Sequence, residues 1–150
     1  MFGFGAPKVK PLRLMAEAAD DLPPISALLQ DAALRAGDME YDPAGRHFTL
    51  RMNRFCHETG TTVPLRAPSV LRINGVTRVL RRGFDPKAAG APLSVLGITA
   101  EVVDDPAHAL VLHFAGGGER DIRIDVECID VLLMDLAAPR RARSKPVHPA

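Results

Sequence analysis

Arginine is the residue type whose number and spacing first suggest chemistry in this sequence. Residues 46–82 contain eight arginines and a single acidic residue, Glu58, which gives this stretch a net charge of +7. The flanking stretches are acidic: residues 1–45 carry four basic and seven acidic side chains, and residues 83–138 carry three basic and ten acidic ones. A planar guanidinium group binds carboxylates and phosphates through two parallel hydrogen bonds. The basic block is therefore either an anion-binding face or a set of strands that lies beside the acidic strands in the fold.

Five of these arginines are the candidates for binding an anion or a protein partner, because they lie in or next to predicted strands. They are Arg51, Arg54, Arg78, Arg81 and Arg82. Nucleic acid is the less favoured partner, since the chain has no Trp, one Tyr and six Phe. So few aromatic rings make poor stacking platforms for unpaired bases.

The residue types that enzymes use as nucleophiles and metal ligands occur without the spacing that such sites require. Cys56 and His57 are adjacent, and adjacent strand residues point to opposite faces, so the thiol and the imidazole would not normally meet. The five histidines are scattered singly, which does not match the paired spacing of a zinc site. The glycine run 116–118 leads into another strand, whereas a phosphate-binding loop leads into a helix. We therefore predict no catalytic residue, no metal and no cofactor.

Composition predicts a single domain with no membrane insertion. The chain has 150 residues, of which 47% are apolar, and this is enough to enclose one core. No apolar run approaches the ~18 residues that a bilayer crossing needs, and the start does not resemble a secretory signal. Cys56 and Cys128 have no second thiol at redox or metal spacing, which is typical of a reducing compartment. We expect a cytoplasmic protein with a flexible N-terminus (1–10), one α+β domain (11–138) and a disordered basic tail (139–150).

Apolar residues at helical spacing predict one helix near each end of the domain. The first is expected over residues 21–36, with Gly37 placed to end it in a left-handed conformation. The second is expected from about Glu127 and stops before Pro139. Its apolar stripe consists of Ile129, Leu132, Leu133 and Leu136.

Between the two helices apolar and polar residues alternate, which predicts about seven antiparallel strands. The alternation is clearest at residues 47–53, where Phe48, Leu50 and Met52 share one face. Asn74-Gly75 predicts a hairpin between two of the strands. The other strands are expected at residues 39–41, 69–73, 76–82, 93–103, 110–114 and 122–126. This α+β order predicts a small barrel or sandwich between an N-terminal and a C-terminal helix, and it is similar to the element order of pleckstrin-homology-like barrels.

Six segments in order along the chain carry a resemblance to a known family. They are Leu14–Glu17, Ile25–Ala32, Gly37–Met39, Asn53–Phe55, Phe114–Gly118 and Asp125–Asp130. Over about residues 11–137 the sequence resembles small alphaproteobacterial proteins known as the domain of unknown function family 2948. The resemblance implies a shared fold and assigns no activity. One departure is Cys56-His57, where family members often have an Arg-Trp pair.

The function that these patterns favour is a non-catalytic binding or adaptor module with an arginine-rich surface. Its partner would be an unknown protein or an anionic ligand, and a homodimer is one form it could take. Two alternatives stay open. One is an enzyme whose site is assembled from scattered polar residues such as Asp38, His57 and Asp125, which requires a pocket where such groups converge. The other is an RNA-binding protein, whose affinity would fall steeply with salt.

Overall fold

The structure, a computed structural model, describes residues 10–57, 63–116 and 118–142. The predicted flexible N-terminus therefore lies outside the described residues except for Lys10, and the predicted tail lies outside them from residue 143 onward.

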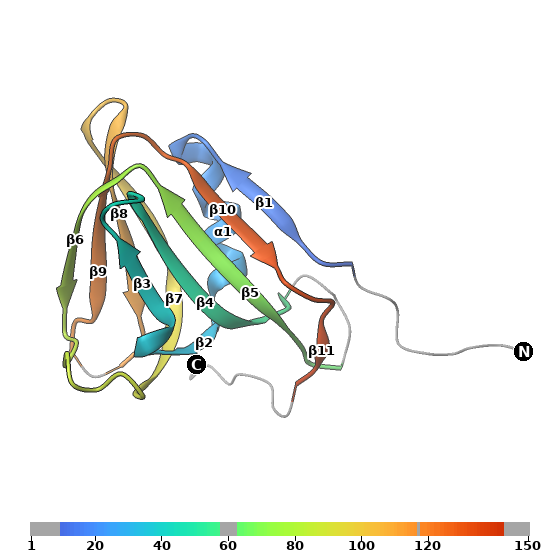
Figure 1. Cartoon of the computed structure of the whole chain (residues 1–150). Helices are drawn as coiled ribbons and strands as arrows, with labels where there is room; N and C mark the ends of the chain where they lie inside the picture. Colours follow the sequence, from blue (N-terminus) through green and yellow to red (C-terminus); the bar gives the residue numbers. More distant parts are fainter. Residues whose placement is uncertain (1–9, 58–62, 117, 143–150) are drawn as a thin grey trace, which may run out of the picture.

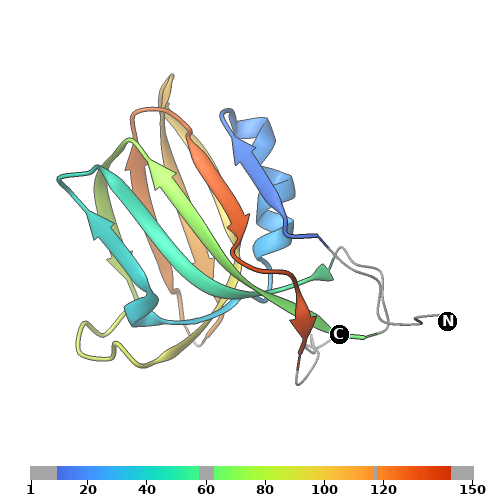
Figure 2. The same ribbon diagram turned by 45° about the vertical axis from the view of Figure 1, so that its right-hand side comes forward.

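The strands form one open antiparallel sheet that bends into two layers (Figures 1 and 2). In spatial order, the first layer is β1 (Arg13–Ala16), β10 (Val131–Asp135), β5 (Leu65–Asn74) and β4 (His47–Phe55). The short β2 (Ala33–Arg35) pairs with β4 on one side and with β7 on the other, and so joins the layers. The second layer is β7 (Pro92–Asp104), β8 (Ala107–Phe114), β9 (Asp121–Val126) and β6 (Val76–Arg82). Two further strands, β3 (Met39–Asp42) and β11 (Arg140–Arg141), pair with β4 and β5 respectively.

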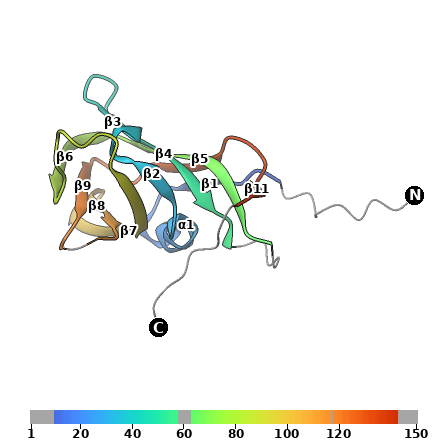
Figure 3. The same cartoon turned by 90° about the horizontal axis from the view of Figure 1, so that it is seen from below.

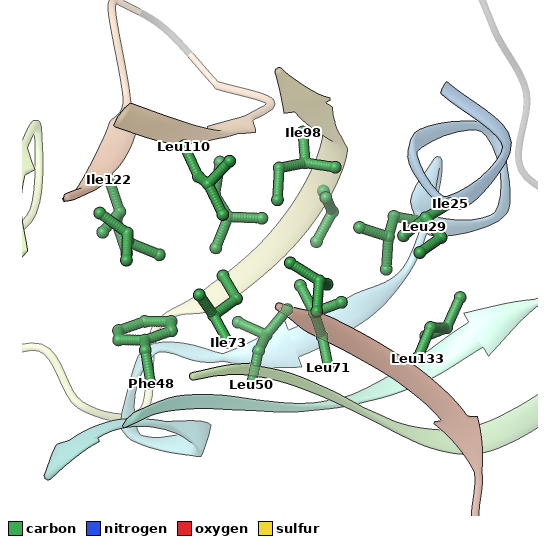
Figure 4. Packing of buried hydrophobic residues seen from close by; sticks show 14 of the residues in the cluster. Ile25, Leu29, Phe48, Leu50, Leu71, Ile73, Ile98, Leu110, Ile122 and Leu133 are labelled. Carbon is green, nitrogen blue, oxygen red and sulfur yellow. The ribbon is translucent and has the colours of Figure 1, made fainter. Parts of the chain in front are cut away.

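The core lies between the two layers (Figure 4). Phe48 and Leu50 are fully buried and Met52 is nearly so, which confirms the inward face predicted for β4. Across the core from them lie Ile98, Leu110 and Ile122 of the second layer. Alternate residues of each strand thus meet in the middle, as the two-residue period of a half-buried strand requires.

The one α-helix in the described residues, α1 (Leu22–Leu29), is shorter than the predicted helix 21–36. It packs mainly against β7 (Figure 3), where it buries Ile25 and Leu29. The helix ends at Leu29 because Gln30 has an extended ψ of 132° and Asp31 after it is left-handed with φ 69°, which an α-helix cannot contain. Residues 33–35 then form β2, and Gly37 lies in the 3₁₀ turn η2 (Ala36–Asp38) that follows it. A second 3₁₀ turn, η1 (Ala19–Asp21), directly precedes α1. None of the described helices is long and apolar enough to cross a membrane.

The predicted fold class was wrong, because the sheet is not closed and residues 131–135 form β10 instead of a C-terminal helix. Val131 and Leu133 are fully buried, while Leu132 and Met134, which alternate with them, are only half-buried. A strand that is apolar on both faces has apolar residues at every position. Such a run also contains apolar residues at helical spacing, so periodicity alone does not distinguish the two structures. Pairing with β1 and β5 on its two sides decided the outcome. The small barrel or sandwich flanked by two helices, and with it the pleckstrin-homology-like arrangement, is replaced in the described part of the chain by an open two-layer sheet with one short α-helix.

The predicted hairpin at Asn74-Gly75 was also wrong, although the turn itself exists. β5 pairs with β4 and β10, whereas β6 pairs with β9, so the chain passes from one layer to the other at this point. Gly75 has φ +68°, and its carbonyl accepts a hydrogen bond from the Glu127 amide. The second predicted hairpin, over residues 110–126, is confirmed as β8 and β9.

Replacing Gly75 by alanine is expected to lower the free energy of unfolding by about 1–2 kcal/mol, because an L-residue is strained in the left-handed region. An added Cβ would meet nothing within 4 Å, so the cost is one of backbone conformation alone. Urea denaturation measures it. Gly90→Ala is the matched control, since its φ lies outside the left-handed range and its Cβ would only approach the Arg35 guanidinium at 4.0 Å. Equal effects of the two substitutions would contradict this account of the turn.

Candidate functional site

The five predicted arginines do not form one patch. Arg54 is the most deeply placed, because its side chain continues the inward face of β4 and is 0% exposed. Its Nη2 donates to Asp135 Oδ2 at 2.9 Å, and its Nε donates to Asp135 Oδ1 at 3.1 Å. This two-point contact is an internal ion pair within the first layer, and it keeps Arg54 away from any external ligand.

Asp135 receives two further hydrogen bonds. Ser69 Oγ donates to its Oδ1 at 2.6 Å, and the Leu12 amide donates to its Oδ2 at 2.8 Å. Burial alone would raise the pKa of Asp135, but the hydrogen bonds from Arg54, Ser69 and Leu12 hold it below its ordinary value. The cluster therefore holds β10, β5, β4 and the start of β1 together through one ionised carboxylate.

Arg78 and Arg82 lie on β6 and are paired with acidic residues of the neighbouring segment. Arg78 Nε contacts Asp125 Oδ2 at 2.9 Å, and Arg82 contacts both Asp121 and Glu119. Burial alone would raise the pKa of Asp125, but hydrogen bonds from Arg78 and from Arg123, which lies on the same strand as Asp125, hold that pKa below its ordinary value. The basic block and the acidic stretch after residue 83 are thus neighbours here, as one of the two sequence interpretations expected.

Arg51 and Arg81 are the two predicted arginines that contact no carboxylate in the part of the chain that the structure describes. They lie on different layers. Arg81 is near the end of β6 and lines a small pocket of about 370 Å³ with Met39 and Phe84. Arg51 projects from the solvent side of β4, opposite the core.

The solvent side of the first layer, called the outer face below, carries an apolar centre with arginines at its edges. Its central residues are Arg13, Met15, Thr49, Arg51, Val70, Arg72, Leu132 and Met134. The strand register places them in two rows. The first row runs Arg13, Met134, Val70, Arg51 across β1, β10, β5 and β4. The second row runs Met15, Leu132, Arg72, Thr49 across the same strands.

The apolar residues of the outer face do not belong to the core. Val70, Leu132 and Met134 are half-buried by their own strand neighbours and are absent from the core and from the side chains that pack on it. Met15 is 55% exposed, and Leu136, two residues beyond Met134, is 57% exposed. In Figure 1 α1 lies behind these strands, and no described element lies in front of them. The described chain therefore leaves this face uncovered.

The arginines of the outer face contact no carboxylate in the described chain, as is also true of Arg81 on the other layer. Arg46, Arg54, Arg78, Arg82 and Arg123 each contact a carboxylate. Among the described residues Arg13, Arg51 and Arg72 contact none, and Arg72 only donates from Nε to Asn74 Oδ1 at 3.0 Å. Sequence reasoning found Arg51 and missed Arg13 and Arg72. The signal available for Arg72 was its place between two apolar residues of a strand, which puts it on the polar side.

A second polar cluster, which sequence reasoning did not assemble, lies where β4 ends. His57 Nε2 is 2.9 Å from the Gln30 carbonyl oxygen and 3.3 Å from Asp31 Oδ2. Arg66 Nη1 donates to the Asp31 carbonyl at 3.2 Å, and burial lowers the pKa of Arg66 against the opposing effect of Asp31. The Cys56 thiol is buried and points to the Arg54 carbonyl at 3.9 Å. These contacts fasten the end of α1 to β4 and β5.

The polar residues of the enzyme alternative do not converge in the described part of the chain. Asp38 accepts a hydrogen bond from the Arg35 amide in η2, Asp125 pairs with arginines on β6 and β9, and His57 contacts Asp31. Within these described residues no three His, Cys, Asp or Glu side chains gather closely enough to hold a metal ion.

Over the residues that the structure describes, fold and site together define a class of protein: a small, open antiparallel β protein with one short α-helix and a sheet face that no described element covers and that combines apolar residues with arginines. The chain belongs to the DUF2948 family, described as a protein of unknown function, whose family model matches residues 12–148. The family expected from the sequence resemblance is thereby confirmed. No curated protein and no solved structure matches the chain.

Proposed function

We propose that the chain is a non-catalytic binding module, and that it holds a protein partner on the outer face of its first layer. The observation that carries this proposal is that both faces of β10 are apolar. Val131 and Leu133 are directed to the core, and Leu132 and Met134 are directed outward. Strands with apolar residues on both faces are typical of sheets that are covered on both sides. Here the described chain covers only one side.

Charge supports the same surface. Three arginines that contact no carboxylate in the described chain lie beside the apolar residues, and arginine and methionine are both enriched in protein interfaces. Arg78, Arg82 and Arg54, which the sequence also favoured, already have carboxylate partners within the chain. A partner that used them would have to displace those contacts. The outer face needs no such exchange.

The cytoplasm is the location that goes with this proposal. Both cysteines are free thiols, one buried and one exposed, and an exposed free thiol is typical of a reducing compartment. Fractionation of cells that express the chain naturally would place it, and recovery outside the cytosolic fraction would contradict this part of the proposal.

Photo-crosslinking in those cells tests the binding surface. A photoreactive amino acid at position 51 or 72 is expected to give a discrete cross-linked species, because both side chains lie on the outer face. The same probe at position 81 is the matched control, since Arg81 is also exposed and free of carboxylate contacts in the described chain but lies on the other layer. Mass spectrometry of the species names the partner.

The result that overturns the proposal is equally concrete. A cross-linked partner at position 81 and none at 51 or 72 would move the binding surface to the second layer. Absence of any cross-linked species at all three positions would also count against it. For a partner so identified, Arg51→Glu in the purified protein is expected to weaken binding, whereas Arg81→Glu is expected to leave it unchanged.

A further inference from the structure

The outer face has dimensions that restrict what can lie on it. Arg13 and Arg51 stand at the two ends of one cross-strand row, with Met134 and Val70 between them. Adjacent strands are about 4.8 Å apart, so the two arginine positions are separated by about 14 Å. An α-helix with its side chains is about 10–12 Å wide. One helix therefore fits between the two arginines.

The apolar strip that runs along the strands has a matching length. Leu132 and Met134 lie on the outward side of β10, and the exposed Leu136 follows directly after its end, where its amide still donates to the Pro68 carbonyl of β5. A strand rises about 3.3 Å per residue, so these three side chains span about 13 Å. This equals about nine residues of α-helix at a rise of 1.5 Å, between two and three turns.

From these observations, and resting on the function proposed above, we infer that the partner element is an acidic amphipathic α-helix. Its apolar stripe would cover Met134, Val70 and Leu132. Acidic residues along both edges of that stripe would meet Arg13 on one side and Arg51 and Arg72 on the other. An amphipathic helix binds through apolar side chains that are spaced three and four residues apart along one of its faces. It uses side chains only, which suits a sheet face whose backbone groups are already engaged in the ladder.

Two other occupants fit the same face less well. A second copy of this chain, packed face to face, would bring Arg13, Arg51 and Arg72 against the same arginines, and like charges across an interface are unfavourable. An anionic membrane is generally recognised by clusters of about four to eight basic residues, whereas the two cross-strand rows together hold three. Neither row contains an aromatic side chain. The protein helix is the occupant that the charge and the dimensions favour together.

The probe for this inference is a synthetic helical peptide of about 18 residues, with leucine along one stripe and glutamate along both edges of that stripe. We expect it to bind the full chain, measured by fluorescence anisotropy, and to shift the backbone amide NMR signals of β10, β5 and β1. Combined replacement of Arg13, Arg51 and Arg72 by glutamate is expected to weaken binding at least about tenfold. Arg81→Glu, on the other layer, is expected to change it less than about twofold.

Two control peptides isolate the features of the probe. One has the same composition in alternating order, which favours a strand, and the other carries lysine in place of glutamate. Both are expected to bind at least about tenfold more weakly. Should the triple variant fold poorly, as judged by circular dichroism, Arg51→Glu alone and the NMR shifts of the unaltered chain decide the question.

Several outcomes would overturn the inference. These are equal binding of the alternating peptide, signal shifts confined to β6 to β9, concentration-dependent dimers that Met134→Asp abolishes, or tighter binding to phosphatidylserine vesicles than to the peptide. The proposed function is tested independently of this inference. If position 51 cross-links to a protein while the acidic helix does not bind, the binding module stands and only the identity of its partner element fails.

Discussion

Replacing Asp135 by asparagine is expected to lower the free energy of unfolding by about 3–5 kcal/mol, the usual cost of removing one member of a buried ion pair. The substitution keeps the shape of the side chain but leaves the guanidinium of Arg54, 0% exposed, without the carboxylate that it contacts at two points. Ser69 and the Leu12 amide lose the same acceptor charge. Equilibrium urea denaturation at pH 7 gives the value directly.

The control for this measurement is an ion pair of the same chemical type at the surface. Arg78 contacts Asp125 at 2.9 Å with its side chain 60% exposed. Pairs of this kind contribute about 0–1 kcal/mol, so Arg78→Gln is expected to change stability by less than about 1 kcal/mol. Similar losses for Asp135→Asn and Arg78→Gln would show that the contact between Arg54 and Asp135 is not the buried pair described here.

The same carboxylate makes the stability of the protein depend on pH in a defined direction. Because the pKa of Asp135 is lower in the folded chain than in the unfolded chain, its ionised form favours folding. This contribution is complete above the unfolded value of about 3.9 and is lost as the pH falls from there toward the folded value. Below about pH 4 the wild type is therefore expected to lose stability more steeply than Asp135→Asn. Parallel curves would contradict the assignment.

Replacing Leu133 by alanine is expected to lower the free energy of unfolding by about 2–5 kcal/mol, as is usual for a large apolar side chain in a packed core. Leu133 is 0% exposed and lies opposite Leu71 and Leu14 on the neighbouring strands. Leu132→Ala is the matched control, one residue away and directed outward, and is expected to cost less than about 1 kcal/mol. Urea denaturation of both variants measures the difference.

This pair of variants also separates the two structures that the sequence allowed for residues 127–138. In the predicted helix Leu132 and Leu133 belonged to one buried stripe, so the two substitutions would cost similar amounts. In β10 adjacent residues point to opposite faces, so the costs differ by several-fold. Similar losses would therefore favour the helix over the strand.

The candidate site could be predicted only in part. The polar side of β4 identified Arg51 as an outward arginine. Arg54 was misplaced although the sequence held a signal for it: the inward residues Phe48, Leu50 and Met52 recur every second position, and one further step reaches Arg54. A lone acid at the end of an apolar run, Asp135, was the matching signal, because a buried charge requires a partner.

By itself the sequence determined the features that depend on neighbours along the chain. The inward face of β4, the hairpin of β8 and β9, and the start of α1 all follow from local period and turn chemistry, which act over a few residues. Membership of the DUF2948 family is likewise carried by short ordered segments.

Only the tertiary structure decided the features that join distant segments. Arg54 and Asp135 are 81 positions apart, and their contact exists because β4, β5 and β10 lie side by side in one register. The same pairing made residues 131–135 a strand and carried the chain across the core at Gly75. Strand pairing also decided which arginines of the basic block contact carboxylates and which are exposed. Register determines which side chains of distant segments meet, and local sequence does not encode register.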